Sequence, residues 1–211
     1  MNIKAVIFDL DGVIVSTDQY HYKAWKQLAD KEDIPFDETI NNQLRGVSRM
    51  ESLEIILKNA DRSYDDKEKF EMTEYKNDIY RKSLEDLSED DILPGFWDVY
   101  HHCRDNNIKM AVGSSSKNTK KILKAIGLDD AFDAVADGTD IENSKPDPEV
   151  FWTAAARLGI DSKFCLVVED AVSGIEAAKN GGMVAVAIGD ATSSEKADHT
   201  IKHLRELIKL L

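Results

Sequence analysis

The sequence has few cysteines, no long apolar run and a shortage of basic residues, and each of these excludes a class of protein. Among 211 residues there are two cysteines, Cys103 and Cys165. Two isolated thiols provide neither a disulfide framework nor the paired spacing of a zinc site. We expect both to be buried thiols in a reducing compartment.

Long hydrophobic stretches are also missing. No apolar run reaches the roughly 18 residues that a membrane-spanning helix needs, and the N-terminal run is interrupted at Asp9. The sequence therefore predicts neither a membrane span nor a signal peptide, and we expect a cytoplasmic location.

Basic residues are outnumbered by acidic ones. Lys and Arg total 27 against 40 Asp and Glu, which gives a formal net charge of −13. A chain this acidic repels phosphate backbones, so we expect no nucleic-acid partner. A phosphorylated small molecule meets the same repulsion, so its site must supply cations of its own.

Short apolar runs alternate with helical patterns over most of the chain. The predicted strands are Ile3–Phe8, Ile108–Val112, Ala134–Ala136, Phe164–Val168 and Met183–Ile188. The predicted helices are Phe96–Asn106, Lys117–Ile126, Glu149–Leu158 and Ser173–Asn180, and the last three are each followed by a glycine (Gly127, Gly159, Gly181) of the kind that ends helices. Strands without polar alternation are typical of a parallel sheet covered on both faces, so we expect an α/β doubly wound fold.

Residues 17–90 break this alternation, because they contain no convincing strand. Helical patterns there cover His21–Lys31, the region near Glu38–Leu44, Met50–Ala60 and Asp66–Leu87. We predict a helical cap domain at 17–90, inserted into a core domain formed by 1–16 and 91–211. An insert at this point lies over the carboxyl ends of the strands, where ligands bind in open α/β sheets.

Two carboxylates follow the first predicted strand. Asp9 and Asp11 are two residues apart, so an extended chain points both side chains the same way. One carboxylate can act as a nucleophile that forms an acyl phosphate, and the other can move the proton of the attacking or leaving oxygen.

Three further polar groups follow later strands. A serine-rich loop opens a helix and can bind an anion, Lys145 precedes a proline-started helix and can reach a phosphate, and Glu169 and Asp170 can join Asp9 around Mg²⁺. Taken singly, these are also a helix cap, a surface lysine and a helix N-terminal acid pair. Together they would converge at one edge of the sheet. The loop residues are Ser114, Ser115, Ser116, Lys117 and Asn118.

In their order along the chain, these four motifs resemble those of the haloacid dehalogenase superfamily. The resemblance implies that Asp9 becomes a phosphoaspartate and that Asp11 is the general acid and base. It implies that Ser114 and Lys145 hold the transferring phosphate. Asp9, the main-chain carbonyl of Asp11, and the carboxylates of Glu169 and Asp170 would bind Mg²⁺.

The insert is similar to that of the sugar phosphomutases in this superfamily. The similarity implies that Arg49 grips the phosphate that is not transferred, that His21 and Lys76 lie near the general acid and base, and that Thr17 lies at a hinge. The same phosphate would also contact Ser116, Lys117 and Asn118. Further substrate contacts are expected at Trp25, Arg45, Gly46 and Ser48.

The expected reaction is the reversible isomerisation of β-D-glucose 1-phosphate and β-D-glucose 6-phosphate. It would pass through β-glucose 1,6-bisphosphate, in a monomer that requires Mg²⁺. A mutase must hold both ends of a bisphosphate and exclude water, whereas a phosphatase needs one phosphate site. A sugar-phosphate phosphatase of the same superfamily is the alternative.

Overall fold

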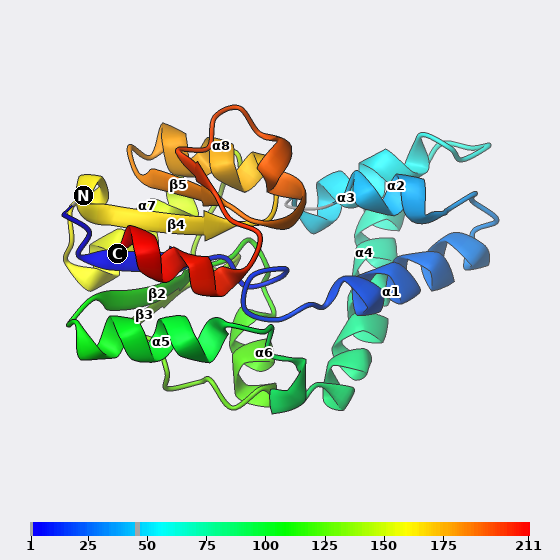
Figure 1. Cartoon of the computed structure of the whole chain (residues 1–211). Coiled ribbons are helices and arrows are strands. Elements are labelled where there is room, and N and C mark those ends of the chain that lie inside the picture. The colour runs from blue at the N-terminus through cyan, green and yellow to red at the C-terminus, as the bar shows by residue number, and fades with distance from the viewer. Residues whose placement is uncertain (1, 45–46) are drawn as a thin grey trace.

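The computed structural model describes residues 2–44 and 47–211, which contain a six-stranded parallel sheet (Figure 1). Its order is β3-β2-β1-β4-β5-β6, so the chain leaves the central β1 toward one edge and later returns to its other side. The predicted α/β doubly wound fold is confirmed. The strands are β1 (Ala5–Phe8), β2 (Lys109–Gly113), β3 (Ala134–Ala136), β4 (Cys165–Glu169), β5 (Val184–Ala187) and β6 (His199–Thr200).

Helices cover both faces of the sheet, and the alternation of side chains along β1 shows how. Val6 and Phe8 pack into one hydrophobic cluster with residues of α5, α6 and the C-terminal 3₁₀ segment. Ala5 and Ile7 pack into the opposite cluster with residues of α7 and α8. The bounds are α5 (Phe96–Asp105), α6 (Thr119–Ala125), α7 (Glu149–Leu158), α8 (Val172–Asn180) and the 3₁₀ segment Leu204–Leu210.

Two predicted details of these elements are corrected. Helix α6 begins at Thr119 and not at Lys117, because the Ser116 hydroxyl accepts a hydrogen bond from the Asn118 N–H at 3.2 Å and holds a local turn. After α8, Gly181 keeps right-handed geometry, and Gly182, with φ 71°, takes the left-handed position. The two-residue β6 was not predicted, because it lies in no apolar run.

In the described part of 17–90 the chain forms helices and no strand. They are α1 (Asp18–Lys31), α2 (Glu38–Asn42), α3 (Arg49–Leu57) and α4 (Asp66–Ser83), followed by 3₁₀ turns at Leu84–Asp86 and Glu89–Asp91. Ser48 and Asp65 form capping boxes that start α3 and α4. Trp25, Leu53 and Met72 belong to a hydrophobic cluster built from these helices and the segments that connect them.

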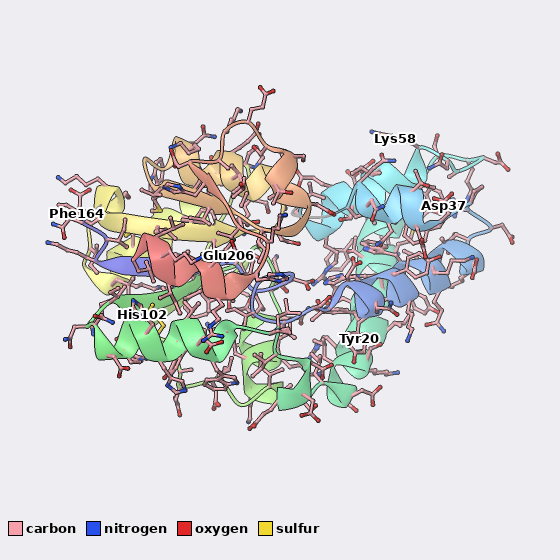
Figure 2. The ribbon with its side chains drawn as sticks, in the orientation of Figure 1. Tyr20, Asp37, Lys58, His102, Phe164 and Glu206 are labelled. Atoms are coloured by element: carbon pink, nitrogen blue, oxygen red, sulfur yellow. The ribbon has the colours of Figure 1, made fainter. Side chains whose placement is uncertain are left out.

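The helices α1–α4 lie at one end of the sheet, beyond the carboxyl ends of the strands (Figure 1). Phe164, which precedes β4, marks the opposite end, whereas Asp37 and Lys58 belong to the helical part (Figure 2). In the described residues, no helix combines the length and apolar character that crossing a membrane requires. The carboxyl edge of the sheet therefore faces the insert, which is where a ligand site is expected.

Candidate active site

A cavity of about 560 Å³ lies where the carboxyl edge of the sheet meets the helical insert. Its walls come from both parts of the chain, and they include most of the residues singled out from the sequence. Those residues are Asp9, Asp11, His21, Trp25, Ser48, Arg49, Lys76, Ser114, Ser115, Ser116, Lys117, Asn118, Lys145, Glu169 and Asp170. Predicted residues Arg45 and Gly46 lie outside the described residues.

The floor of the cavity is a buried cluster of opposite charges. Asp9 directly follows β1, and its N–H donates to the carbonyl of Val168 in β4 at 3.0 Å. The Lys145 ammonium lies 2.5 Å from Asp9 Oδ1 and also contacts Oε1 of Glu169. Glu169 is the last residue of β4. Lys145 is 3% exposed and Glu169 1% exposed, so water screens these charges little.

The carboxylates of this cluster are held away from their ordinary protonation behaviour. Burial raises the pKa of Asp9 to about 7, with Lys145 opposing the rise and Glu169 adding to it. Burial likewise raises the pKa of Asp170 to about 9, and the nearby Glu169 and Asp9 carboxylates add to it. Burial would lower the pKa of Lys145, but Asp9 and Glu169 raise it overall, so this lysine stays charged. One ammonium faces three acids, so a further cation is favoured here.

These acids suit Mg²⁺. Asp9, Glu169 and Asp170 each offer a carboxylate oxygen, and these oxygens lie within 4.8 Å of one another. Hard oxygen donors at such separations fit around an ion with Mg–O distances of about 2.1 Å. Gly12, with φ +83°, lets Asp170 approach, because a Cβ at that position would lie 2.1 Å from Asp170 Oδ2. The donor set therefore fits the metal that the sequence predicted.

Asp11 is held in place by Thr17, which precedes α1. The Thr17 N–H donates to Asp11 Oδ1 at 2.6 Å, and the Thr17 hydroxyl donates to Oδ2 at 2.5 Å. The Tyr80 hydroxyl of α4 in turn donates to Thr17 Oγ1 at 3.0 Å. Thr17 is fully buried and does not line the cavity, so its contact in this structure is with Asp11.

A chain of polar side chains leads from Asp11 into the insert. His21 Nε2 lies 3.9 Å from Asp11 Oδ2, and His21 Nδ1 lies 2.8 Å from Lys76 Nζ. The Lys76 ammonium also lies 4.7 Å from the ring centroids of Trp25 and Tyr80. Burial, followed by the Lys76 charge, lowers the pKa of His21 well below its ordinary value. A neutral His21 that accepts from Lys76 at Nδ1 carries its proton on Nε2, facing Asp11.

The serine-rich loop after β2 places several donors on the wall beside Asp9. Ser114 Oγ accepts from the Ser116 N–H at 3.2 Å, which folds the loop back on itself. Ser115 Oγ is buried and has no hydrogen-bond partner among the described residues. An unsatisfied buried hydroxyl in a cavity wall is costly, and a phosphate oxygen would satisfy it.

Arg49 lies on the insert side of the cavity. It is the first residue of α3, and its Nη1 donates to Glu74 Oε1 of α4 at 2.8 Å. Asn118 of the core donates through Nδ2 to Asn77 Oδ1 of α4 at 3.0 Å, which links the two sides. Arg49 of the insert and Lys117 of the core therefore border the same cavity, in addition to Lys145 on its floor.

Helix α4 supplies further wall residues that no sequence motif singles out. Thr73, Asn77 and Tyr80 line the cavity together with Lys76 and are mostly buried. Their spacing of three and four residues places them on one face of the helix. The repeat of polar residues at this spacing around Lys76 is the sequence signal that could have indicated these wall residues.

Known proteins with similar sequences and structures agree on one family. The model of the haloacid dehalogenase-like hydrolases matches residues 3–182. The β-phosphoglucomutase of Bacillus subtilis strain 168 is 42% identical over 207 residues, which are 97% of this chain and 92% of that protein. The phosphorylated carbohydrates phosphatase of Thermotoga maritima is 29% identical over 86% of this chain and 82% of its own. A crystal structure of β-phosphoglucomutase from Clostridium difficile superimposes with TM-score 0.91 at 40% identity, covering 97% of this chain and 93% of that one.

Proposed function

The chain belongs to the haloacid dehalogenase-like hydrolase family, and we propose that it is a β-phosphoglucomutase. It interconverts β-D-glucose 1-phosphate and β-D-glucose 6-phosphate by moving a phosphoryl group through Asp9. The observation that supports this function is a single cavity lined by two groups of cationic and polar side chains that can bind phosphate. The first group contains Ser114 and Lys145, which contacts Asp9. The second contains Arg49, Lys117 and Asn118, which also line an adjoining groove that the first group does not reach.

We infer that the phosphorylated Asp9 gives its phosphoryl group to the 6-hydroxyl of glucose 1-phosphate, while Asp11 accepts the hydroxyl proton. The product is β-glucose 1,6-bisphosphate, which reorients in the closed cavity so that its other phosphate faces Asp9. Asp9 then attacks the phosphorus at C1, and Asp11 returns the proton to O1, which leaves glucose 6-phosphate. The bisphosphate also serves as the primer that phosphorylates a resting enzyme.

The remaining residues of the floor neutralise charge during these transfers. A carboxylate attacking a phosphoryl dianion meets repulsion, which Lys145 offsets from 2.5 Å away. When bound by Asp9, Glu169, Asp170 and the carbonyl of Asp11, Mg²⁺ supplies the remaining positive charge. The donors of Ser114 and Ser115 hold the oxygens of the phosphoryl group.

The second group of cations distinguishes isomerisation from hydrolysis. Because a mutase must keep the bisphosphate through a reorientation, it needs a grip on the phosphate that is not reacting. Arg49 can form two parallel hydrogen bonds to a phosphate. The proposal includes the division into a core and a cap at residues 17–90. In it the cap opens to admit a sugar phosphate and closes to exclude water.

One experiment tests the function. β-Glucose 1-phosphate is supplied with Mg²⁺ and a trace of the bisphosphate, and glucose 6-phosphate and inorganic phosphate are measured in the same reaction. We expect glucose 6-phosphate to form in large excess over inorganic phosphate. Release of phosphate without isomerised product would identify a sugar-phosphate phosphatase, the alternative that the Thermotoga maritima relative supports. A cytoplasmic, monomeric enzyme that binds no nucleic acid completes the proposal.

A further inference from the structure

Arg49 is already paired with an acid on the cavity wall. Its Nη1 lies 2.8 Å from Glu74 Oε1, and the two side chains are 24% and 48% exposed. Burial lowers the pKa of Arg49, and Glu74 opposes that change, so the carboxylate compensates for the partial loss of water around the guanidinium. Glu74 therefore acts as the anionic partner of Arg49 in the ligand-free protein.

Glu74 shares the wall with Arg49, where an incoming phosphate would meet both. Both residues line the main cavity, and both also line an adjoining groove that includes the cations Arg81, Lys117 and Lys121. A carboxylate and a phosphate dianion bound to the same guanidinium repel each other. Glu74 also occupies the Nη1 donor of Arg49, which a phosphate could otherwise use. A phosphate that binds Arg49 through Nη1 must therefore displace Glu74.

We propose that Glu74 is a specificity-determining residue that competes internally with the distal phosphate for Arg49. A phosphate dianion has charge enough to displace Glu74, whereas an unphosphorylated sugar does not and leaves Arg49 paired. The pair thus makes engagement of Arg49 conditional on a second phosphate. This inference rests on the proposed function, because it assumes that Arg49 receives the phosphate that is not transferred.

The chain offers a matched control. Lys69 of α4 and Glu54 of α3 form a second ion pair between the same two helices at 2.7 Å, with side chains 22% and 49% exposed. Glu54 is not among the residues that line either cavity. Glu74→Gln and Glu54→Gln therefore remove equal charge and comparable cross-helix pairs, but only the first touches the phosphate path.

The test is calorimetric titration of each variant with glucose 6-phosphate in Mg²⁺, together with thermal unfolding. We expect Glu74→Gln to bind about three- to tenfold more tightly than wild type, because breaking a partly exposed pair costs up to about 1 kcal/mol and the repulsion adds to it. Glu54→Gln should bind within about twofold of wild type, with a similar loss of melting temperature. In an Arg49→Ala background, the gain from Glu74→Gln should disappear.

Three outcomes would overturn the inference. The first is equal affinity of the Glu74→Gln and Glu54→Gln variants for glucose 6-phosphate. The second is weaker binding by Glu74→Gln, which would make Glu74 a support that orients Arg49 toward the phosphate. The third is a gain in affinity from Glu74→Gln that persists in the Arg49→Ala background. Failure of the wild type itself to bind glucose 6-phosphate would instead reject the proposed function. Steady-state kinetics add a separate readout, because relief of competition should lower KM for β-glucose 1-phosphate and leave kcat nearly unchanged.

Discussion

Replacing Lys145 with Met tests the charge balance of the cavity floor. Lys145 is 3% exposed, lies 2.5 Å from Asp9 Oδ1 and also contacts Glu169. Removing one partner of a buried ion pair leaves uncompensated charge and typically costs about 3–5 kcal/mol. In a protein of 211 residues, each 1 kcal/mol lowers the melting temperature by about 2–4 °C, so we expect a loss of about 10 °C.

The assay is thermal unfolding followed by circular dichroism in EDTA, at pH 5, 6.5 and 8. The raised pKa of Lys145 means that its stabilising charge is present throughout this range. Asp9, whose pKa is raised to about 7, is ionised at pH 8 and takes up its proton as the pH falls through 7. The deficit of Lys145→Met should therefore be largest at pH 8 and smaller at pH 5. Mg²⁺ should reduce it at pH 8, because the ion replaces the missing positive charge.

A surface pair provides the control. Lys196 pairs with Glu176, and its side chain is 60% exposed. Lys196→Met should cost less than about 1 kcal/mol at every pH. If Lys145→Met melted within about 2 °C of wild type in EDTA at pH 8, the Lys145 charge would not be what offsets the buried carboxylates of the cavity floor.

Three further predictions concern the metal, the proton and the distal phosphate. Stabilisation of the wild type by Mg²⁺, measured by thermal shift, should grow from pH 6 to pH 9. The reason is that Asp9 and Asp170 have pKa values raised to about 7 and about 9 and must lose protons to bind the ion. A stabilisation that did not change with pH would contradict this. Asp11→Asn should lower kcat by about 100-fold or more, while thermal shift shows the Mg²⁺ effect retained; near-normal turnover would exclude Asp11 as the general acid and base. Arg49→Ala should lower the ratio of glucose 6-phosphate to released phosphate by about tenfold, measured in one reaction, and an unchanged ratio would remove Arg49 from the mutase function.

The convergence on the cavity floor could be predicted from the sequence because it follows from the order of the sheet. Asp9, Lys145 and Asp170 each lie in a loop after a parallel strand, and such loops meet at one edge. Local patterns were therefore sufficient to bring together residues that are far apart in the chain.

The contacts of α4 could not be predicted in the same way. Tyr80 reaches Thr17, and Glu74 reaches Arg49, only because α4 packs beside α1 and α3. The rotation of one amphipathic helix against another depends on complementary side-chain shapes and not on the apolar period of either helix. For the same reason the hydrogen bonds from Thr17 to Asp11 could not be predicted, since the neighbours of Thr17 in sequence do not indicate that it faces Asp11.

The phosphorylation state of Asp9 tests the central claim most directly. The enzyme is incubated with radiolabelled β-glucose 1,6-bisphosphate and Mg²⁺, quenched and reduced with borohydride, and the peptides are sequenced by mass spectrometry. We predict Mg²⁺-dependent label on the quenched protein. Borohydride should release this label as inorganic phosphate while it reduces the aspartyl phosphate to homoserine at position 9. A chase with unlabelled glucose 1-phosphate before the quench should return the label to bisphosphate. Homoserine at another position, or a protein that isomerises the sugar phosphate and yields no homoserine at position 9, would contradict the account.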